Sequence, residues 1–489
     1  MGKKSTSVFT DSRLDVAFEA LLEAMMKRRS CTLRQVASNR GQEVRFGRFI
    51  NNDSVTPDRI LDRYWKSIKA DWSDKHLLVI SDTSTLTFDK RADRKVGSQV
   101  GMNSSAQGFD IHSVLTMDAD DFGIYGAGGI KIITNDFSQA EEDKTARLAR
   151  RKKVYQLPLC DKESYKWLDT SAQAIERMPR AARYTLVGDR EADIYELACE
   201  VVARGWDFLY RNRQDRRIVV DGQATTLYKT LDTWSPRHTF ELKVQASKHH
   251  RAHTASMQVK FGALTLCRPG TTSTSSVPAQ LPVYVIEAKE ESKSIIGRDK
   301  AVHWILWTSH AITTLQEAMQ ALGWYSARWD IEQSYRALKR KGLRIESSEV
   351  ETFEALCNLA TLSMLCVGLT LQMIRAREGL TAQRADEVFN EQEQACLRYL
   401  NSSLEGKTAA SCNPYPPRSL AFAAWVVARL GGWKGYAKER PAGPTTMMIG
   451  LNRLFDMSRG FEVATALQTA LHSHLLTDQK CLRPSVCIP

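Results

Sequence analysis

Acidic side chains occur at three places where the surrounding sequence would hold them in fixed positions. Asp82 ends the apolar run 76–82, and Asp189 ends a second apolar run, 184–189. Such runs are typical of buried strands, and an Asp at the end of one is, taken alone, more often a turn or cap residue. The third, Glu332, lies in a segment of helical character, where the neighbouring side chains are more informative.

The segment around Glu332 predicts a helix with two adjacent stripes. At about 100° per residue, five large polar side chains fall within a stripe about 80° wide: Tyr325, Arg328, Glu332, Arg336 and Lys339. An apolar stripe lies about 100° to one side of it: Trp324, Ala327, Ile331, Tyr335 and Leu338. A buried aromatic edge beside these polar groups fits the wall of a cleft, although ordinary surface pairs four residues apart would give the same pattern.

Three carboxylates that converge on one point would make a site for a hard cation. Mg²⁺ prefers oxygen ligands, keeps several waters and is completed by substrate phosphate. Two such ions can activate an attacking oxygen and stabilise the leaving oxygen of a phosphodiester. Cations on the same helix face would then hold the flanking phosphates. The chemistry predicted from the residues is therefore metal-dependent phosphodiester cleavage.

Two motifs carry a resemblance to a known family. Residues 189–193 form the string DREAD, and Tyr325, Arg328, Glu332 and Lys339 have a Y-(2)-R-(3)-E-(6)-K spacing. Together they resemble the DDE transposases of bacterial insertion sequences, in the hairpin-forming branch of the IS-four family that includes the transposase of the transposon numbered five. Residues 80–84 resemble the strand that carries the first Asp of that family.

The resemblance implies roles for individual residues. Asp82, Asp189 and Glu332 would be the catalytic residues and the ligands of Mg²⁺, for which Mn²⁺ would substitute. Trp304, 21 residues before Tyr325, would stack on a flipped base, because aromatic faces stabilise unstacked bases. Without the resemblance, a buried strand residue is the better interpretation of Trp304. The DNA-binding set as a whole is Tyr325, Arg328, Lys339, Arg336, Trp304, Arg211, Arg213, Arg190 and Arg48.

The resemblance also implies a fold and a reaction sequence. The expected fold is α/β: an RNase H-like (retroviral-integrase-like) catalytic core with a β-strand insertion, flanked by helical domains at both ends. The expected reactions are nicking, hairpin formation, hairpin hydrolysis and strand transfer at transposon ends, and the expected partners are double-stranded DNA and a second copy of the chain. A membrane or a nucleotide cofactor is not expected.

The distribution of residue types along the chain agrees with a catalytic core flanked by two helical domains. Residues 1–70 are predicted to be a helical domain that binds transposon ends, with 14 basic and 8 acidic side chains. Residues 71–377 are predicted to be the catalytic domain, with a strand-rich insertion at about 206–308. Residues 378–489 are predicted to be a helical dimerisation domain, in which 428–432 resembles the part that pairs subunits. The basic run 144–153 could follow DNA or be a solvated surface.

Composition limits the remaining possibilities. The 489 residues are 43% hydrophobic and 25% charged, with a net charge of +12, which favours a polyanionic partner. The longest apolar run, 421–428, is far short of the roughly 20 residues that cross a bilayer. No signal peptide or paired cysteine spacing is evident, so a bacterial cytoplasmic, nucleoid-associated location is expected. Two alternatives stay open: a non-catalytic regulator that binds transposon ends, and an RNase H-like nuclease without joining activity.

Overall fold

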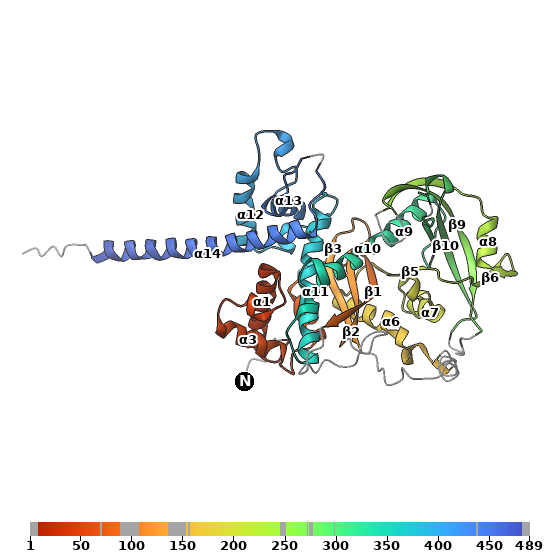
Figure 1. The fold of residues 1–489 in the computed structure, drawn as a ribbon, viewed down its shortest axis with the longest axis horizontal. Coiled ribbons are helices and arrows are strands. Elements are labelled where there is room, and N and C mark those ends of the chain that lie inside the picture. The colour runs from red at the N-terminus through yellow and green to blue at the C-terminus, as the bar shows by residue number, and fades with distance from the viewer. Residues whose placement is uncertain are drawn as a thin grey trace, which may run out of the picture. The chain divides into compact units, whose positions relative to one another are not determined.

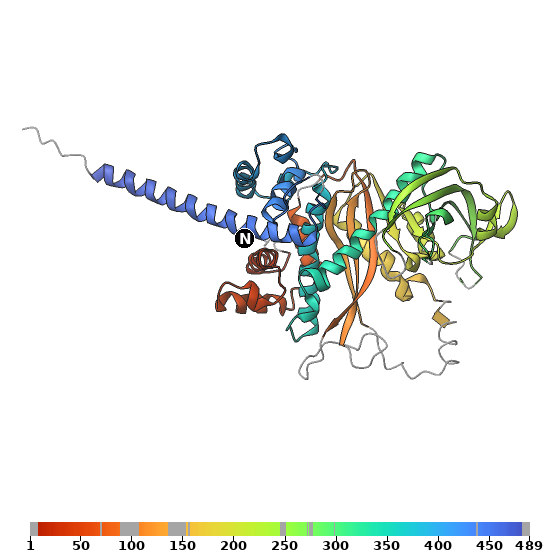
Figure 2. The same ribbon diagram turned by 45° about the horizontal axis from the view of Figure 1, so that its top comes forward.

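The computed structural model describes the chain in ten stretches: 8–68, 71–88, 107–134, 153–154, 157–244, 251–270, 272, 277–297, 299–436 and 439–481. Most of the basic run 144–153 lies outside them. The chain divides into two compact units. We call them the sheet unit (Asp53–Arg336 and Glu346–Thr361) and the helical unit (Met1–Asn52, Ala337–Ile345 and Leu362–Pro489). Each is described by itself (Figures 1 and 2).

The sheet unit is built on a mixed sheet in which the first five strands have the order β3-β2-β1-β4-β5. β1 pairs antiparallel with β2, and β2 pairs antiparallel with β3, whereas β4 is parallel to β1 and β5 is parallel to β4. Their bounds are His76–Phe88, Gln107–Asp118, Ile124–Ile133, Arg183–Gly188 and Asp207–Arg211 for β1 to β5. The parallel pairs require crossovers, and helices supply them.

Helices cover both faces of these strands, as the alternation of side chains along β1 shows. Ser81 contacts Ser171 of α6 (Lys166–Arg177), with 3.2 Å between the two hydroxyls. The next side chain, Asp82, belongs to the opposite face, and so does Ser113, its partner in the register with β2. The Ser113 hydroxyl lies 2.8 Å from the hydroxyl of Tyr335 on α10 (Trp329–Arg336). The carboxylate of Asp82 therefore faces α10.

Glycines in β3 allow α6 to lie very close to the sheet. A Cβ at Gly129 would be 2.4 Å from the backbone oxygen of Thr170, and one at Gly128 would be 2.9 Å from the Cβ of Ala174. Distances below 3.0 Å essentially never occur for real Cβ atoms. The glycine-rich sequence of β3 is thus explained by the approach of α6.

The insertion extends the same sheet. After β5 the order continues β11-β10-β9-β6-β7, and β8 pairs with β9. The bounds are Arg217–Val220, Gln223–Thr226, His238–Val244, His253–Cys267, Gln280–Glu290 and His303–Thr308 for β6 to β11. The sequence predicts a strand within five of these six ranges. The insertion predicted from the sequence, at about 206–308, includes β5, which begins at Asp207. The parallel pairing of β5 with β4 instead makes it a strand of the core.

After the insertion the chain forms α9 (Leu315–Ala327) and then α10, which Figure 2 shows as a nearly straight rod. A capping box at Thr314 and Glu317 fixes the start of α9. At the junction, the amides of Arg328 and Ile331 bond to carbonyls three residues back, at 3.1 and 3.2 Å. This tightened turn and a π-helical turn at Ala337–Lys341 depart from the single regular helix that the sequence predicts.

The helical unit contains α1 (Ser12–Arg28), α2 (Leu33–Val36), α3 (Arg40–Ile50), α12 (Glu391–Leu404), α13 (Leu420–Leu430) and α14 (Pro444–Cys481). Buried side chains of α13 pack against Met447, Leu451, Leu454 and Phe455 of α14. α1 also contacts α14, and the thiol of Cys366 lies 3.9 Å from the carbonyl oxygen of Leu22. Helices from both ends of the chain therefore share one unit, whereas the sequence predicts two separate end domains.

α4 (Pro57–Ser67) falls in the sheet unit rather than with α1 to α3. The indole nitrogen of Trp65 donates to the carbonyl of Ala127 on β3 at 2.8 Å, and Arg177 of α6 pairs with Asp62 at 2.8 Å. The division at residue 70 that the sequence predicts thus lies at a different place from the division between the compact units.

One helix in the described part of the chain, α11 (Phe353–Ala376), is long and apolar enough to cross a membrane by length and composition. Its most apolar window is 94% buried inside the structure, as is usual for a core helix. The helix contributes residues up to Thr361 to the sheet unit and the rest to the helical unit.

Candidate active site

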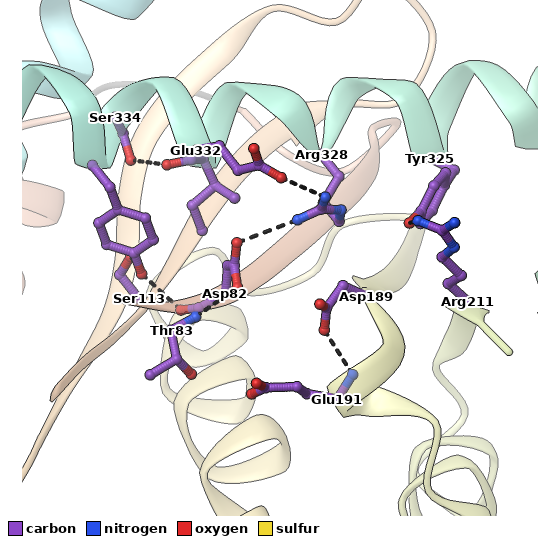
Figure 3. A network of polar contacts seen from close by, with 12 residues as sticks. Asp82, Thr83, Ser113, Asp189, Glu191, Arg211, Tyr325, Arg328, Glu332 and Ser334 are labelled. Atoms are coloured by element: carbon purple, nitrogen blue, oxygen red, sulfur yellow. Dashed lines mark hydrogen bonds and ion pairs between the residues drawn. The ribbon is translucent and has the colours of Figure 1, made fainter. Parts of the chain in front are cut away.

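Asp82 is held on β1 by one contact to its backbone and one to its side chain. The hydroxyl of Tyr335 donates to the carbonyl oxygen of Asp82 at 2.7 Å, and the amide of Thr83 donates to the Asp82 carboxylate at 2.8 Å. The apolar stripe of α10 thus carries a tyrosine that ties the helix to the strand at this residue. Figure 3 shows the carboxylate pointing from the strand toward α10.

Asp189 directly follows β4 and caps the short 3₁₀ turn Arg190–Ala192. Its carboxylate accepts the amide of Glu191 at 2.8 Å. The turn folds back tightly on the strand, since a Cβ at Gly188 would lie 2.4 Å from the Cβ of Ala192. Asp189 is therefore a cap residue and is also presented at the carboxyl end of a central strand.

Glu332 lies in the first turn of α10, and Arg328 connects it to Asp82. The Arg328 guanidinium donates to Glu332 at 2.6 Å and to Asp82 at 3.2 Å (Figure 3). The side chain of Arg328 is only 14% exposed, so these ion pairs are largely shielded from water. Two carboxylates from distant parts of the chain thus share one cation.

Burial raises the pKa of Asp82 to about 6, and the charges of Asp189 and Glu332 act in the same direction. Arg328 and the amide of Thr83 oppose this rise in the pKa. Mutual repulsion among Asp82, Asp189 and Glu332 is the expected sign of three carboxylates that lie near one another in a partly dry site. Perturbed groups of this kind are enriched at functional sites.

The donor chemistry of Asp82, Asp189 and Glu332 fits a hard divalent cation, because all their donor atoms are carboxylate oxygens. Within the described residues, however, no group of three or more His, Cys, Asp or Glu side chains has the close spacing of a metal site. The guanidinium of Arg328 lies between two of the carboxylates and neutralises them. The residues therefore fit a metal chemically, in an arrangement that Arg328 holds together.

Beside the carboxylates, the structure brings together three of the residues that the sequence predicts as DNA contacts. The rings of Trp304 and Tyr325 meet edge to face with 5.4 Å between centroids. Arg211 donates to the hydroxyl of Tyr325 at 3.5 Å and to the carbonyl of His303 at 2.8 Å. Trp304 is half-buried on β11, so it is neither a core residue nor a fully exposed one.

The other predicted DNA contacts are more dispersed. Arg190 and Arg213 are exposed in the sheet unit, and the amide of Arg213 donates to Asp193 at 2.8 Å. Arg336 is also exposed and stacks on the ring of Trp329 at 4.6 Å. Arg48 on α3 and Lys339 in the π-helical turn belong to the helical unit, whereas the three carboxylates belong to the sheet unit.

Sequence reasoning missed a buried ion pair next to Asp189. Arg216 pairs with Asp193 at 2.6 Å, with side chains only 5% and 1% exposed. The sequence did contain a signal for this pair. The second Asp of the DREAD string, Asp193, is not one of the three carboxylates and was therefore left without a role. Its partner, however, lies 23 residues further on, at no recognisable spacing.

Part of the chain matches a known protein family. Residues 166–369 match the family model described as "Transposase DDE domain". The matched stretch includes Asp189 and Glu332 and begins after Asp82. A solved structure, the piggyBac transposase synaptic complex with hairpin DNA, is also similar over 99% of this chain and 80% of its own, with a TM-score of 0.37 and 10% identity.

Enzymes with this domain generally use divalent metal ions and act on DNA. The mixed α/β sheet and the family match together imply an RNase H-like fold. The match over residues 166–369 therefore points to a DNA-cleaving and strand-transferring enzyme, a transposase.

Proposed function

We propose that this chain is a cut-and-paste transposase that nicks DNA at transposon ends, forms a hairpin, hydrolyses it and transfers the freed strand to a target. The observation that carries the proposal is the arrangement of Asp82, Asp189 and Glu332 around Arg328. Each of the four reactions is an in-line attack of an oxygen on a phosphodiester, so one site could perform all of them.

Asp82, Asp189 and Glu332 are the residues that would hold the metal, and we propose Mg²⁺, with Mn²⁺ as a substitute. When bound, the metal would supply activation of the attacking oxygen and charge stabilisation at the leaving oxygen. β1, the end of β4 and α10 each contribute one carboxylate. β1 and β4 are neighbouring strands and α10 packs on the sheet, so the core sets the positions of Asp82 and Glu332, while Asp189 lies in the turn that follows β4.

Arg328 has a second role in this proposal. Its guanidinium donates to one oxygen of each of two carboxylates, and a DNA phosphate offers two non-bridging oxygens that accept the same kind of donor. With Asp82 and Glu332 holding a cation, Arg328 would bind a phosphate beside the scissile bond. Arg211 and the hydroxyl of Tyr325 lie together and would bind a neighbouring phosphate.

The half-buried Trp304 would stack on an extruded base, with Tyr325 supporting its ring from the edge. The exposed cations Arg190, Arg213 and Arg336 would contact the DNA backbone further out. Arg48 and Lys339 would contribute from the helical unit.

We also propose a family branch, an oligomeric state and a cellular location for the protein. The chain would belong to the hairpin-forming branch of the IS-four family, act as a homodimer on paired DNA ends and work in the bacterial cytoplasm at the nucleoid. The segment 428–432, which resembles the subunit-pairing region, lies at the end of α13, where Ala428 and Leu430 are buried and Gly432 is exposed. Further apolar surface for pairing is offered by the exposed side chains of Phe461, Val463 and Leu467 on α14.

The test uses purified protein, Mg²⁺ and a labelled duplex that carries the inverted repeat bordering the coding sequence, with flanking DNA. A denaturing gel separates nicked strands, hairpins and double-strand breaks. We expect a hairpin product that disappears in EDTA and in Glu332→Ala. The control is Glu176→Ala, which removes an exposed carboxylate from α6 and should leave the products unchanged.

Other outcomes would contradict specific parts of the proposal. Nicks without hairpins would indicate a nuclease and remove the role given to Trp304. Binding of the duplex without any cleavage would contradict an active transposase. Cleavage by Glu332→Ala at the wild-type rate would show that the carboxylates have been wrongly assigned.

A further inference from the structure

The loop that carries Asp189 is fastened at its far end by a residue of the insertion. Asp193 follows the 3₁₀ turn that Asp189 caps, and the amide of Ala192 bonds to the carbonyl of Asp189 at 3.2 Å. Both ends of this five-residue segment are therefore defined by aspartates. Figure 3 shows the first of them, Asp189, on the same side as Arg328 and Asp82, whereas Asp193 bonds to Arg216.

Both carboxylate oxygens of Asp193 are occupied by donors of the protein. Arg216 donates to one of them through Nε at 3.1 Å and through Nη2 at 2.6 Å. The amide of Arg213 donates to the other oxygen at 2.8 Å. Arg216 Nη2 also donates to the backbone carbonyl of Asp193 at 2.8 Å. Asp193 is thus excluded as a metal ligand and is held by the chain that leads from β5 into β6.

Arg216 is itself fixed from several sides. Its guanidinium lies over the ring of Trp307 on β11, 5.0 Å from the centroid. Its carbonyl accepts the amide of Leu227, the first residue of α8 (Leu227–Thr233), at 2.9 Å. Arg216 is therefore held by two elements of the insertion, β11 and α8, and it is bonded to the end of the loop that carries Asp189.

We propose that Arg216 is a positioning residue for the active site: through Asp193 it sets the position of Asp189 and so the geometry in which the three carboxylates bind a divalent cation. A catalytic group must be held within a fraction of an ångström by residues around it, and the first turn after a strand is the least constrained part of this site. The insertion would thus act on the chemistry from within the protein core, in addition to any contact that it makes with DNA. The inference depends on the proposed function only for its cleavage readout.

The experiment compares wild type with Asp193→Asn and Arg216→Lys. Arg216→Lys keeps the positive charge and loses the two-pronged contact. Mn²⁺ binding is followed by the electron paramagnetic resonance signal of free Mn²⁺, and Asp189→Ala defines the binding that belongs to the site. Cleavage of the labelled duplex is measured in parallel across a series of Mg²⁺ concentrations.

We expect both variants to bind Mn²⁺ roughly 10-fold or more weakly and to need correspondingly more Mg²⁺ for half-maximal cleavage, as is typical when residues that orient metal ligands are altered. The matched control is Glu290→Gln. Glu290 is another buried carboxylate of the insertion, bonded to His253, Ser294 and the amide of Val302. Loss of the Glu290 carboxylate should lower thermal stability without changing the Mn²⁺ affinity or the Mg²⁺ concentration needed for half-maximal cleavage.

The double variant that combines Arg216→Lys with Asp193→Glu tests for rescue. Because the glutamate side chain is longer than that of aspartate, its carboxylate can reach the lysine ammonium, and Mn²⁺ affinity should partly return. Folded single variants with wild-type Mn²⁺ binding and Mg²⁺ dependence would overturn the inference. Unfolding of both single variants would overturn it as well, because the pair would then serve stability alone. Failure of the wild type to cleave DNA would contradict the proposed function, while the Mn²⁺ measurement would still decide this inference.

Discussion

At the scale of single residues, Tyr335 links the two elements that carry Asp82 and Glu332. Its hydroxyl donates to the backbone of Asp82 at 2.7 Å and lies 2.8 Å from the hydroxyl of Ser113. The ring is 6% exposed, and burial strongly raises the pKa of its hydroxyl, so the group stays protonated and can always donate. The position of α10 over β1 therefore depends on a polar contact inside an otherwise apolar stripe.

Tyr335→Phe should accordingly reduce both stability and cleavage. Loss of the hydroxyl leaves the carbonyl of Asp82 and the hydroxyl of Ser113 without this partner, at a cost of about 1–3 kcal/mol in the free energy of unfolding. Urea denaturation measures this, and the duplex assay measures the rate. The control, Tyr415→Phe, removes a hydroxyl that donates to the carbonyl of Arg377 at 2.8 Å in the helical unit. Equal cleavage by both variants would contradict the positioning role of Tyr335.

Some residues of the candidate site could be predicted from the sequence, whereas the contacts between them could not. Local patterns, the strand ends and the helical spacing, mark Asp82, Asp189, Glu332 and Arg328 as candidates, and the family resemblance supplies the roles proposed for them. The contact of Arg211 with Tyr325, 114 residues away, depends on the pairing of β5 with β11. The Arg216–Asp193 pair likewise depends on how the insertion joins the core. No local pattern encodes such contacts.

At the scale of elements, β2 buries a histidine on the face opposite to Asp82. His112 is fully buried against Trp167 of α6, with 4.8 Å between ring centroids. Its Nδ1 lies 2.8 Å from the hydroxyl of Thr83, while its Nε2 has no hydrogen-bond partner among the residues that the structure describes. Burial lowers the pKa of His112 to about 3, and the charges of Lys166 and Lys131 act in the same direction. The packing of α6 on the sheet thus requires a neutral imidazole.

Because the imidazole of His112 must stay neutral in the folded state, we expect the free energy of unfolding to fall in acid. Unfolded His112 would bind a proton near its ordinary pKa of about 6.5, whereas the folded state resists it down to about 3. The stabilising contribution is therefore complete above about pH 6.5 and falls by about 1.4 kcal/mol per pH unit below it. Between pH 6.5 and 4.5 the free energy of unfolding of wild type should fall by about 2–3 kcal/mol more than that of His112→Phe. Parallel pH profiles in urea denaturation would contradict this.

The elements themselves were largely predictable, with informative exceptions. The strands of the core and most of those of the insertion follow apolar runs, and α11 and α13 follow long apolar segments. α12 and α14 lie within the range 378–489 that the sequence predicts to be helical, but their separate bounds were not predicted, and much of their surface is polar or exposed. The glycines of β3 were noticeable in the sequence, but only the approach of α6 explains them.

At the scale of the whole molecule, the division into units could not be predicted from chain order. The helical unit collects three separated segments, so neither end of the chain forms a compact unit on its own. Contact between α1 and α14 arises between residues more than 400 positions apart. Such contacts leave no trace in local periodicity, which explains why two helical end domains were predicted instead.

This organisation gives different expectations for two truncations within α14. The first part of the helix carries buried core residues, among them Met447, Leu451, Leu454 and Phe455. Beyond Ser458 every side chain described is exposed, and Figure 1 shows this part of the helix extending away from the rest of its unit. Ending the chain at residue 443 would remove several core side chains at about 2–5 kcal/mol each, which approaches the whole stability of a domain, about 5–15 kcal/mol.

A chain that ends at residue 443 should therefore lose the cooperative thermal unfolding of the helical unit and aggregate. A chain that ends at residue 460 keeps the core of α14 and should unfold within a few degrees of the full chain, while losing the exposed apolar side chains Phe461, Val463 and Leu467. Differential scanning calorimetry and light scattering measure both properties. Because these side chains are not needed for the core, a shift from dimer to monomer in the 460 variant, at unchanged thermal stability, would locate subunit pairing on distal α14. Loss of stability in the same variant would instead show that the distal helix is part of the fold.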